Sequence, residues 1–314
     1  MDIAFGPVPS RRLGRSLGIN NIPPKHCSYA CIYCQVGPTP EQEITPRPFY
    51  PPEEILRQVR TRLETVRARG AAVDYLTFVP DGEPTLDSRL GEAIDALREL
   101  ALPIAVISNA SLLWYADARA ALARADWVSV KIDTVDPKVW ERINRPHGVL
   151  RLADVLGGIQ HFAAEFDGQL VSETMLVAGL NDGAEDIAAL GRFISAAPIE
   201  RAYLAIPHRP PAVAAVRAPE ERVVLRAFRT LAGQGVETEL LTAYEGDAFA
   251  SGSDLRAEIL SISAVHPLRT SAIQALLENG GGSMALVDEL LAAGELRRLE
   301  YAGEVFYLRR LNRE

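Results

Sequence analysis

Residues 26–37 read HCSYACIYCQVG and contain every cysteine of the chain, Cys27, Cys31 and Cys34. The spacing Cys-x3-Cys-x2-Cys puts three soft sulfur ligands on one short loop, and thiolates at that density select iron or zinc. A closed zinc site needs four ligands, but the chain has no fourth cysteine, and His26 adjoins Cys27 too closely to complete a tetrahedron. The pattern therefore favours a [4Fe–4S] cluster with three protein ligands and one open iron.

The residues around the cysteines extend this interpretation. Tyr33 lies one position before the third cysteine, and Gly82-Glu83-Pro84 follows an apolar run that predicts a strand. Together with the cysteine spacing, these features resemble the signature of the radical S-adenosylmethionine (SAM) enzymes, over about residues 16–207. The flanking segments FGPVPSRRLGRSLGINNIPP and AVHPLR resemble the wyosine-synthase-like iron–sulfur oxidoreductases, although the chain lacks the cysteines of their second cluster.

The Gly-Glu-Pro triplet has a defined place in that superfamily. The resemblance implies that Gly82, Glu83 and Pro84 contact the amine of SAM, which is held on the open iron and cleaved by an electron from the cluster. The element usually begins with Gly where this chain has Asp81. A lone triplet of this kind is also an ordinary turn, so the interpretation depends on its place after a strand and after the cysteine loop.

Ser108, Asn109 and Tyr33 complete the cofactor site that the resemblance implies. Ser108 and Asn109 lie in the run AVISNASLL, at the end of a predicted strand, and are expected to serve the ribose or the carboxylate of SAM. The same two residues could also cap the helix that follows. Tyr33 is expected beside the adenine, and core packing is the alternative.

Short β-rich runs alternate with amphipathic helical patterns beyond the cysteines, which predicts β/α units around a parallel sheet. Leu56, Val59, Leu63 and Val66, for example, recur at helical spacing. Six units make a partial (β/α)6 barrel, which is also the fold that the resemblance implies, and place the chemistry at the carboxyl ends of the strands. The expected strands are residues 15–20, 73–79, 104–108, 127–133, 170–177 and 202–206.

The strand WVSVKID at residues 127–133 carries a polar stripe. Alternation puts Ser129, Lys131 and Asp133 on one face. Since a parallel strand covered on both faces is normally apolar throughout, this stripe predicts a wet lumen with Lys131 and Asp133 on the substrate side. An internal Lys–Asp pair without function is the alternative. Glu173 lies in another apolar strand and needs a partner, which makes it the third candidate catalytic residue.

The net charge of −8 counts against a broad polyanion-binding surface, because affinity for phosphate comes from clustered Lys and Arg. A tRNA substrate stays possible, since a local patch could suffice. The dense basic cluster is Arg11, Arg12 and Arg15. It is either a solvated arm or a grip for an anionic substrate or a cofactor carboxylate.

The character of the chain changes near residue 250. Two short helices, at residues 268–278 and 284–292, precede a predicted hairpin, LRRLEY-AGE-VFYLRRL, and this order is the outline of a winged helix. We expect a barrel domain of residues 1–250 and a winged-helix-like α+β domain of residues 251–314. The recognition helix would be SMALVDELLAAG, which carries two acids and no base. DNA reading is therefore not expected, and the module is expected to pack or to dock a partner.

The missing cysteines exclude some chemistry. Auxiliary clusters take chiefly thiolate ligands, so methylthiolation and sulfur insertion are not expected. The sequence predicts a radical SAM enzyme that abstracts hydrogen from a substrate, with a modified nucleobase or tRNA first by analogy and a small metabolite or peptide as the alternative. A hypothesis of another class is a non-catalytic iron–sulfur winged-helix sensor.

The remaining predictions concern the electron donor and the location of the protein in the cell. An enzyme of this kind needs an electron donor such as flavodoxin or ferredoxin. The first residues show no signal-peptide pattern, and no apolar run approaches the roughly 20 residues of a membrane span. We therefore expect a cytoplasmic protein with no membrane contact, where reduced thiols can carry a cluster.

Overall fold

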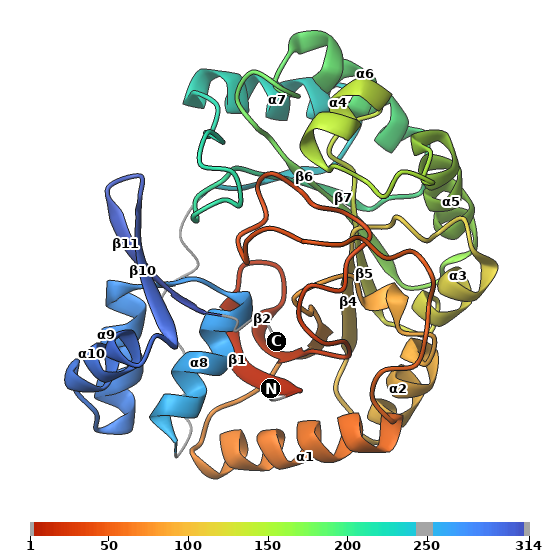
Figure 1. Ribbon diagram of the computed structural model, residues 1–314. Helices are drawn as coiled ribbons and strands as arrows, with labels where there is room; N and C mark the ends of the chain where they lie inside the picture. Colours follow the sequence, from red (N-terminus) through yellow and green to blue (C-terminus); the bar gives the residue numbers. More distant parts are fainter. Residues whose placement is uncertain (1–2, 243–253, 311–314) are drawn as a thin grey trace.

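The computed structural model describes residues 3–242 and 254–310. Within them an eight-stranded sheet runs in chain order and curves into a half ring (Figure 1). The first pair of strands is antiparallel and every later pair is parallel. This architecture confirms the predicted partial barrel. The strands are β1 (Ala4–Ser10), β2 (Gly14–Ile19), β3 (Tyr75–Phe78), β4 (Ile104–Ser108), β5 (Trp127–Lys131), β6 (Gln169–Met175), β7 (Arg201–Ala205) and β8 (Thr238–Leu241).

Helices cover the outer face of the sheet (Figure 1). The first begins after Pro51, with Pro52 at its first turn, and buries Ile55, Val59 and Leu63 against the strands. None of the helices in the described ranges is long and apolar enough to cross a membrane. They are α1 (Pro52–Ala68), α2 (Leu90–Leu97), α3 (Ala116–Leu122), α4 (Pro137–Ile143), α5 (Leu152–Glu165), α6 (Ala184–Ser195) and α7 (Glu221–Gly233), with 3-10 turns at Pro84–Leu86 and Arg98–Leu100.

The strand β1 was not expected from the sequence. Its residues AFGPVPS contain two prolines, which demote a run to an edge strand or to no strand at all. The register with β2 shifts between Phe5 and Val8, so the prolines are accommodated in an irregular pairing. The ring of Phe5 packs directly on Gly18, where a Cβ would lie 2.1 Å from the ring. A glycine in β2 therefore makes room for the hairpin.

The C-terminal residues form a small α+β module with its own core, as predicted. It contains α8 (Leu255–Val265), β9 (Leu268–Arg269), α9 (Thr270–Gly280), α10 (Ala285–Ala292), β10 (Leu296–Tyr301) and β11 (Glu304–Arg309), and its sheet order is β10-β11-β9. The sequence interpretation missed α8 and began the next helix two residues early, because Leu268 and Arg269 pair with β11. The predicted domain boundary between residues 250 and 251 lies outside the described residues.

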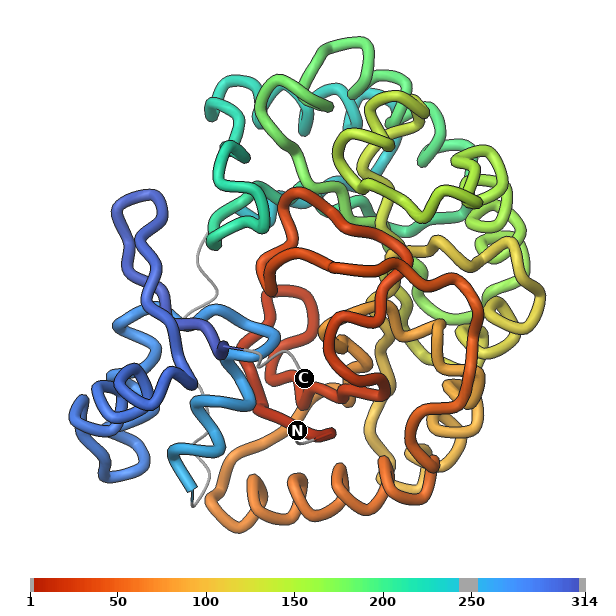
Figure 2. The backbone as a smooth tube through the Cα atoms, in the orientation of Figure 1, coloured from red at the N-terminus to blue at the C-terminus, as the bar shows by residue number. Residues whose placement is uncertain are grey.

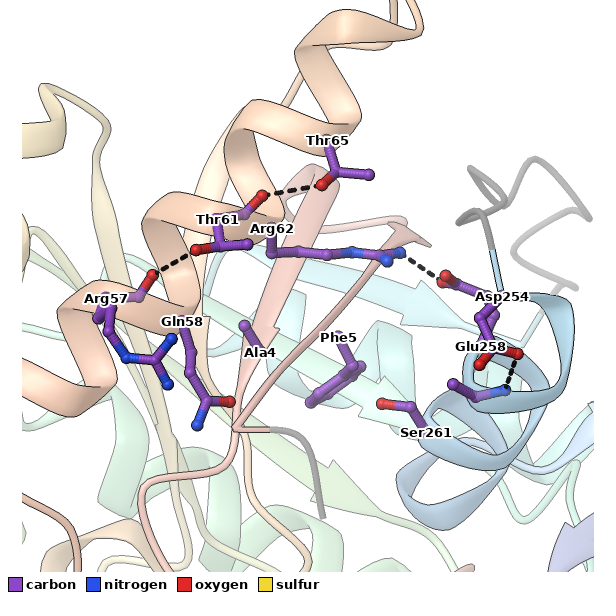
Figure 3. A pocket seen from close by; sticks show the side chains of 11 residues that line it. Ala4, Phe5, Arg57, Gln58, Thr61, Arg62, Thr65, Asp254, Glu258 and Ser261 are labelled. Atoms are coloured by element: carbon purple, nitrogen blue, oxygen red, sulfur yellow. Dashed lines mark hydrogen bonds and ion pairs between the residues drawn. The ribbon is translucent and has the colours of Figure 1, made fainter.

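The module lies against β1, at the side where the half ring is open (Figure 1). Arg62 reaches from α1 to Glu258 on α8, and both side chains are largely buried (Figure 3). A cavity of about 330 Å³ lies beside this ion pair, between α1, β1 and α8. Further contacts join Tyr301 Oη to the Pro207 carbonyl at 3.0 Å. Because α8 covers β1, the module shields the edge of the barrel sheet.

Candidate active site

A cavity of about 300 Å³ lies at the carboxyl ends of the parallel strands. The long connection between β2 and α1, drawn red to orange in Figure 2, winds across this open face of the sheet and carries the cysteines. Most of the residues singled out from the sequence meet at this cavity. Its lining includes Cys27, Cys31, Tyr33, Cys34, Gly82, Glu83, Ser108, Asn109, Lys131 and Glu173, while Pro84 and Asp133 lie behind it.

The cysteine loop is fixed from behind by the segment that follows α4. The amide of Ile32 donates to the Ile143 carbonyl at 2.9 Å, and the amide of Ala30 donates to the Asn144 carbonyl at 3.1 Å. Tyr29 pairs with Pro146 in an isolated bridge. These bonds flank Cys31 on both sides, so the loop between the first and third cysteines has a defined backbone.

Two asparagine side chains donate to the cysteine sulfurs. Asn109 Nδ2 lies 3.5 Å from Cys27 Sγ, and Asn144 Nδ2 lies 3.5 Å from Cys31 Sγ. Burial is the largest cause that raises the pKa of the Cys31 thiol to about 12, and the nearby Asp133 and Cys34 add to it. The hydrogen bond from Asn144 opposes this rise. Burial is also the largest cause of the raised pKa values of Cys27 and Cys34.

No group of His, Cys, Asp or Glu in the described residues is arranged to hold a metal ion in common. A cluster makes a different demand, because each thiolate binds its own iron and the ligands are spread further apart. The structure offers three thiols on one loop that all face one cavity. This donor set, with amide N–H groups directed at two of the sulfurs, fits an iron–sulfur cluster chemically.

The Gly-Glu-Pro loop packs against the start of the cysteine loop. A Cβ on Gly82 would lie 2.1 Å from the His26 carbonyl oxygen, so only glycine fits. The amide of Glu83 donates to the same carbonyl at 2.9 Å. Asp81, which replaces the usual Gly, has no positive φ and forms a 3.0 Å ion pair with Lys25. The replacement of Gly by Asp81 therefore leaves the backbone unstrained. Burial raises the pKa of Asp81 to about 6, although the charge of Lys25 opposes the rise.

The Glu83 carboxylate ties the loop after β3 to the loop after β4. It accepts hydrogen bonds from the Thr85 hydroxyl at 2.6 Å, the Ser108 hydroxyl at 2.7 Å and the Asn109 amide at 2.7 Å. Burial raises the pKa of Glu83, and these donors oppose the rise. Its oxygens are thus engaged within the protein, and the side chain holds the shape of the site.

Ser108 and Asn109 close a turn of their own. The Ser108 hydroxyl accepts from the Ala110 amide and the Asn109 side-chain oxygen accepts from the Ser111 amide, each at 2.9 Å. The next helix, α3, begins only at Ala116. The alternative that these residues cap that helix is therefore wrong, and their turn presents Asn109 to both Cys27 and Ser28.

Lys131 and Glu173 are side by side on the neighbouring strands β5 and β6, and both line the cavity. Lys131 Nζ lies 2.6 Å from Glu173 Oε1, and Arg12 pairs with the other oxygen of Glu173. Burial raises the pKa of Glu173, but Lys131 and Arg12 outweigh burial and lower it to about 2. The partner of Lys131 is therefore Glu173, which corrects the alternative of a Lys131–Asp133 pair.

Asp133 serves the cysteine loop. Its carboxylate accepts from the Tyr33 hydroxyl, from Asn144 Nδ2 at 2.7 Å and from the Met175 amide at 2.8 Å. Sequence reasoning placed Asp133 on the substrate side and missed Asn144 altogether. The run INRPH gives no sign beyond a turn after a helix, so only the fold could bring Asn144 to the cysteines.

The arginine cluster divides between two environments. Arg11 and Arg12 line the cavity, and Arg12 lies 5.9 Å above the rings of both Trp127 and Tyr203. Arg15 points outward and pairs with Asp74 at 2.7 Å. The solvated-arm interpretation therefore fits Arg15, whereas a role for Arg11 and Arg12 in holding an anionic group stays a prediction.

The C-terminal module contributes to the rim. Val265, the last residue of α8, lines the cavity, and its carbonyl accepts from Gln35 Nε2 at 3.1 Å. Arg209 donates to Gln35 Oε1 at 2.9 Å and lies 3.2 Å from His266 Nε2. Because Gln35 follows Cys34 directly, the module is attached to the loop that carries the thiols.

Several known proteins are similar to this chain in sequence or in fold. Residues 21–193 match the Radical SAM superfamily. A UPF0026 protein of Methanocaldococcus jannaschii is 41% identical over 99% of this chain and 97% of its own length, and one from Helicobacter pylori strain 26695 is 32% identical over 71% of each. A radical SAM methyltransferase from Sphaerobacter thermophilus is similar in fold (TM-score 0.56, 16% identity, 73% of this chain and 67% of that one). So is SuiB of Streptococcus suis bound to S-adenosylmethionine (TM-score 0.53, 16% identity, 73% and 51%).

Proposed function

The chain belongs to the radical SAM superfamily and to the UPF0026 family, and from that premise we propose how its site works. Cys27, Cys31 and Cys34 hold one [4Fe–4S] cluster, and SAM binds beside it. When bound, the cluster supplies the electron that cleaves SAM to methionine and a 5′-deoxyadenosyl radical, which abstracts hydrogen from the substrate. The observation that carries the proposal is that the thiols, the Gly-Glu-Pro loop and Asn109 line one cavity.

The loops after β3 and β4 form the cofactor half of the cavity. Gly82 lets the loop approach the cysteine segment, and Glu83 fixes it to Ser108 and Asn109. With its carboxylate engaged by these donors, Glu83 would act mainly by fixing the backbone of the loop that would meet the ammonium of SAM. Ser108 and Asn109 then serve the ribose or carboxylate, and Tyr33 lies by the adenine. Pro84 starts the 3-10 turn behind this loop.

The ends of β5 and β6 form the substrate half. Lys131, Glu173 and Arg12 make a buried charged layer above an apolar floor that includes Trp127 and Tyr203. Lys131 and Glu173 are the proposed substrate contacts, and Asp133 acts from behind by orienting Tyr33. Such a layer can orient a polar substrate, while the aliphatic walls limit where a reactive hydrogen is placed.

A nucleobase or tRNA is the substrate that we place first. Arg11, Arg12 and Arg209 line the cavity and supply cationic groups of the kind that recognise phosphate. Two probable GTP 3′,8-cyclases, from Thermococcus kodakarensis and Pyrococcus horikoshii, are 27% and 26% identical to about half of this chain. A peptide or small metabolite is the second candidate, since SuiB has also been solved with its precursor peptide and shares the fold (TM-score 0.54).

The alternative of an iron–sulfur sensor that reads DNA has less support. Asp288 and Glu289 are exposed on α10, the helix in the recognition position of a winged helix. Their charge repels phosphate. We propose instead that the module is a separate domain that packs against the barrel and helps to form the cavity rim. Salt-dependent DNA binding would revive the sensor hypothesis.

The test is anaerobic. The protein is reconstituted with iron and sulfide and then given dithionite and SAM, and 5′-deoxyadenosine and methionine are measured by chromatography. Wild type is expected to form both, and Cys31→Ala is expected to form neither and to bind less iron. Ile32→Val is the matched control, because Ile32 is buried in the same loop but packs against Ile143 and Val177, outside the lining of the cavity.

The same assay ranks substrates and electron donors. Nucleotides, tRNA, peptides and metabolite pools are added in turn, and a true substrate is expected to raise the rate of 5′-deoxyadenosine formation. Flavodoxin or ferredoxin with its reductase replaces dithionite in a second series. A protein that binds a cluster but forms no 5′-deoxyadenosine with any of these additions would contradict the proposal and leave the sensor hypothesis.

A further inference from the structure

Asn144 is a buried side chain behind the cysteine loop that the proposed binding of SAM and substrate does not use. It follows α4 directly and is 2% exposed. Its carboxamide nitrogen lies 3.5 Å from Cys31 Sγ, 3.3 Å from the Tyr33 hydroxyl and 2.7 Å from Asp133 Oδ2. A buried amide N–H directed at a thiolate ligand is a group that can act on the cluster.

The orientation of this carboxamide is set by Asp133. A carboxylate accepts hydrogen bonds and cannot donate, so the atom of Asn144 beside Asp133 must be the NH2 group. Asp133 is itself held by the Met175 amide at 2.8 Å and by Tyr33. The NH2 group is therefore fixed toward both Asp133 and Cys31, and the reverse orientation would place two oxygens in contact.

The backbone of Asn144 also belongs to the cysteine loop. Its carbonyl accepts from the amide of Ala30, one residue before Cys31, and the neighbouring Ile143 carbonyl accepts from Ile32, one residue after it. The segment that carries Asn144 is therefore bonded to the cysteine loop on both sides of Cys31. The distance between Asn144 Nδ2 and Cys31 Sγ is thus set by these two backbone bonds together with the side-chain bond from Asn144 to Asp133.

From this geometry we propose that Asn144 is a positioning residue that sets the reduction potential of the cluster through its N–H···S bond to Cys31. The inference rests on the proposed function, since it assumes that Cys31 binds a cluster. Reduction adds negative charge to the cluster and its sulfurs, and a hydrogen-bond donor stabilises that charge. The donor therefore raises the potential, and its removal lowers it and makes reduction harder.

Asn109 makes the corresponding bond to Cys27 but is a less clear test. It lines the cavity and is a proposed SAM contact, so its substitution would change cofactor binding as well. Asn144 lies outside the lining of that cavity. A change at Asn144 can therefore be followed in the absence of SAM, as a property of the cluster alone.

The experiment is a potentiometric titration of the reconstituted protein, followed by electron paramagnetic resonance without SAM. Asn144→Leu keeps the approximate size of the side chain and removes the donor. The midpoint potential is expected to be more negative than that of wild type at unchanged iron and sulfide content. Asn144→Ala is the second variant, with the same expected direction, in case the branched side chain prevents folding.

Asn181→Leu is the matched control. Asn181 is also a buried carboxamide, 3% exposed, and its Nδ2 donates to the backbone carbonyls of Asp133 and Met175 at 2.8 Å. It borders the same network, so we expect its loss to cost comparable stability, but its bonds end on backbone groups, which include the Val177 amide at 2.8 Å from its Oδ1. The midpoint potential of this variant is expected to equal that of wild type.

The outcomes separate the two proposals. A cluster that forms in wild type, with equal potentials in wild type and both Asn144 variants, would overturn the role of Asn144 and leave the proposed function standing. An equal shift in Asn181→Leu would also overturn it, because the effect would then be structural. Failure of wild type to take up a cluster would overturn the proposed function itself.

Discussion

The two halves of the cavity each contain a largely buried glutamate, Glu83 in the loop after β3 and Glu173 near the carboxyl end of β6, but the charges around the two differ. Glu83, in the cofactor half, is surrounded by neutral donors, and burial raises its pKa. Glu173, in the substrate half, lies between Lys131 and Arg12, which lower its pKa to about 2 despite burial. The same residue type thus has a raised pKa among neutral donors in one place and a lowered pKa between two cations in the other. Environments that separate two carboxyl groups in this way are typical of active sites.

The largest effect is expected from removing the charge in the substrate half. Glu173→Leu leaves Lys131 and Arg12 as buried cations without their shared anion, which costs about 3–5 kcal/mol of unfolding free energy. Urea denaturation of the reduced apoprotein measures the loss. The control is Glu239→Gln, which removes the partly exposed partner of Arg201 and is expected to change stability by about 1 kcal/mol or less. Similar losses in both variants would contradict the contrast between the halves.

Much of this substrate half could be predicted from the sequence. Strict alternation in WVSVKID put Lys131 on the lumen side, and the charge in an apolar strand marked Glu173 as needing a partner. The identity of that partner could not be predicted. Lys131 and Glu173 are paired in the register of β5 and β6, whereas Asp133 lies beyond the end of β5. Arg12 comes from a hairpin that was not expected.

The cofactor half was predicted for a different reason. The three cysteines and the Gly-Glu-Pro triplet are local patterns, so the cysteine spacing and the resemblance located them. The parts that were missed are non-local. Asn144 comes from a segment more than a hundred residues along the chain, and β1 and α8 were hidden by prolines and by a mixed polar pattern with buried Glu258 and Ser261.

A smaller effect is expected from Glu83→Gln. The amide replaces one acceptor oxygen with a donor that faces the Asn109 amide or the Ser108 hydroxyl, and this mismatch costs about 1–3 kcal/mol. The same variant is expected to weaken SAM binding, because the loops after β3 and β4 lose their connection. Calorimetric titration of SAM into the reconstituted protein measures that loss. Thr65→Val on α1, whose hydroxyl bonds to its own helix, is the control and should bind SAM as wild type does. Unchanged affinity in Glu83→Gln would assign the connection to another residue.

The pH dependence of stability should show opposite signs in the two halves. Asp81, beside Glu83, has an ordinary pKa of 3.8 and a folded pKa of about 6. The folded state therefore binds a proton more readily than the unfolded state, and the apoprotein gains stability as the pH falls from about 7 to 4. Each tenfold difference in proton affinity between the two states contributes roughly 1.4 kcal/mol. Glu173 has a folded pKa of about 2, below its ordinary 4.5, so its contribution is lost as the pH falls from about 5 to 2.

Denaturation at a series of pH values tests this pattern. Asp81→Asn is expected to reduce the gain between pH 7 and 4, and part of the gain should persist because burial also raises the pKa of Asp87 to about 6. Glu173→Gln is expected to flatten the loss at lower pH. A gain of equal size in wild type and in the double variant Asp81→Asn/Asp87→Asn would contradict the assignment.

The smallest effect on stability is expected at Arg15, and it tests the contrast between a buried and an exposed charge. Arg12 and Arg15 belong to one basic cluster in the sequence, but Arg12 is buried against Glu173 and the Trp127 ring, whereas Arg15 pairs with Asp74 in solvent. Arg12→Met is expected to cost about 1–3 kcal/mol, since a charged hydrogen bond to a buried carboxylate is lost. Arg15→Met is expected to leave stability within the error of urea denaturation and to leave 5′-deoxyadenosine formation unchanged, because water replaces what an exposed ion pair supplies. Equal losses of unfolding free energy in the two variants would contradict this distinction between a buried and an exposed arginine.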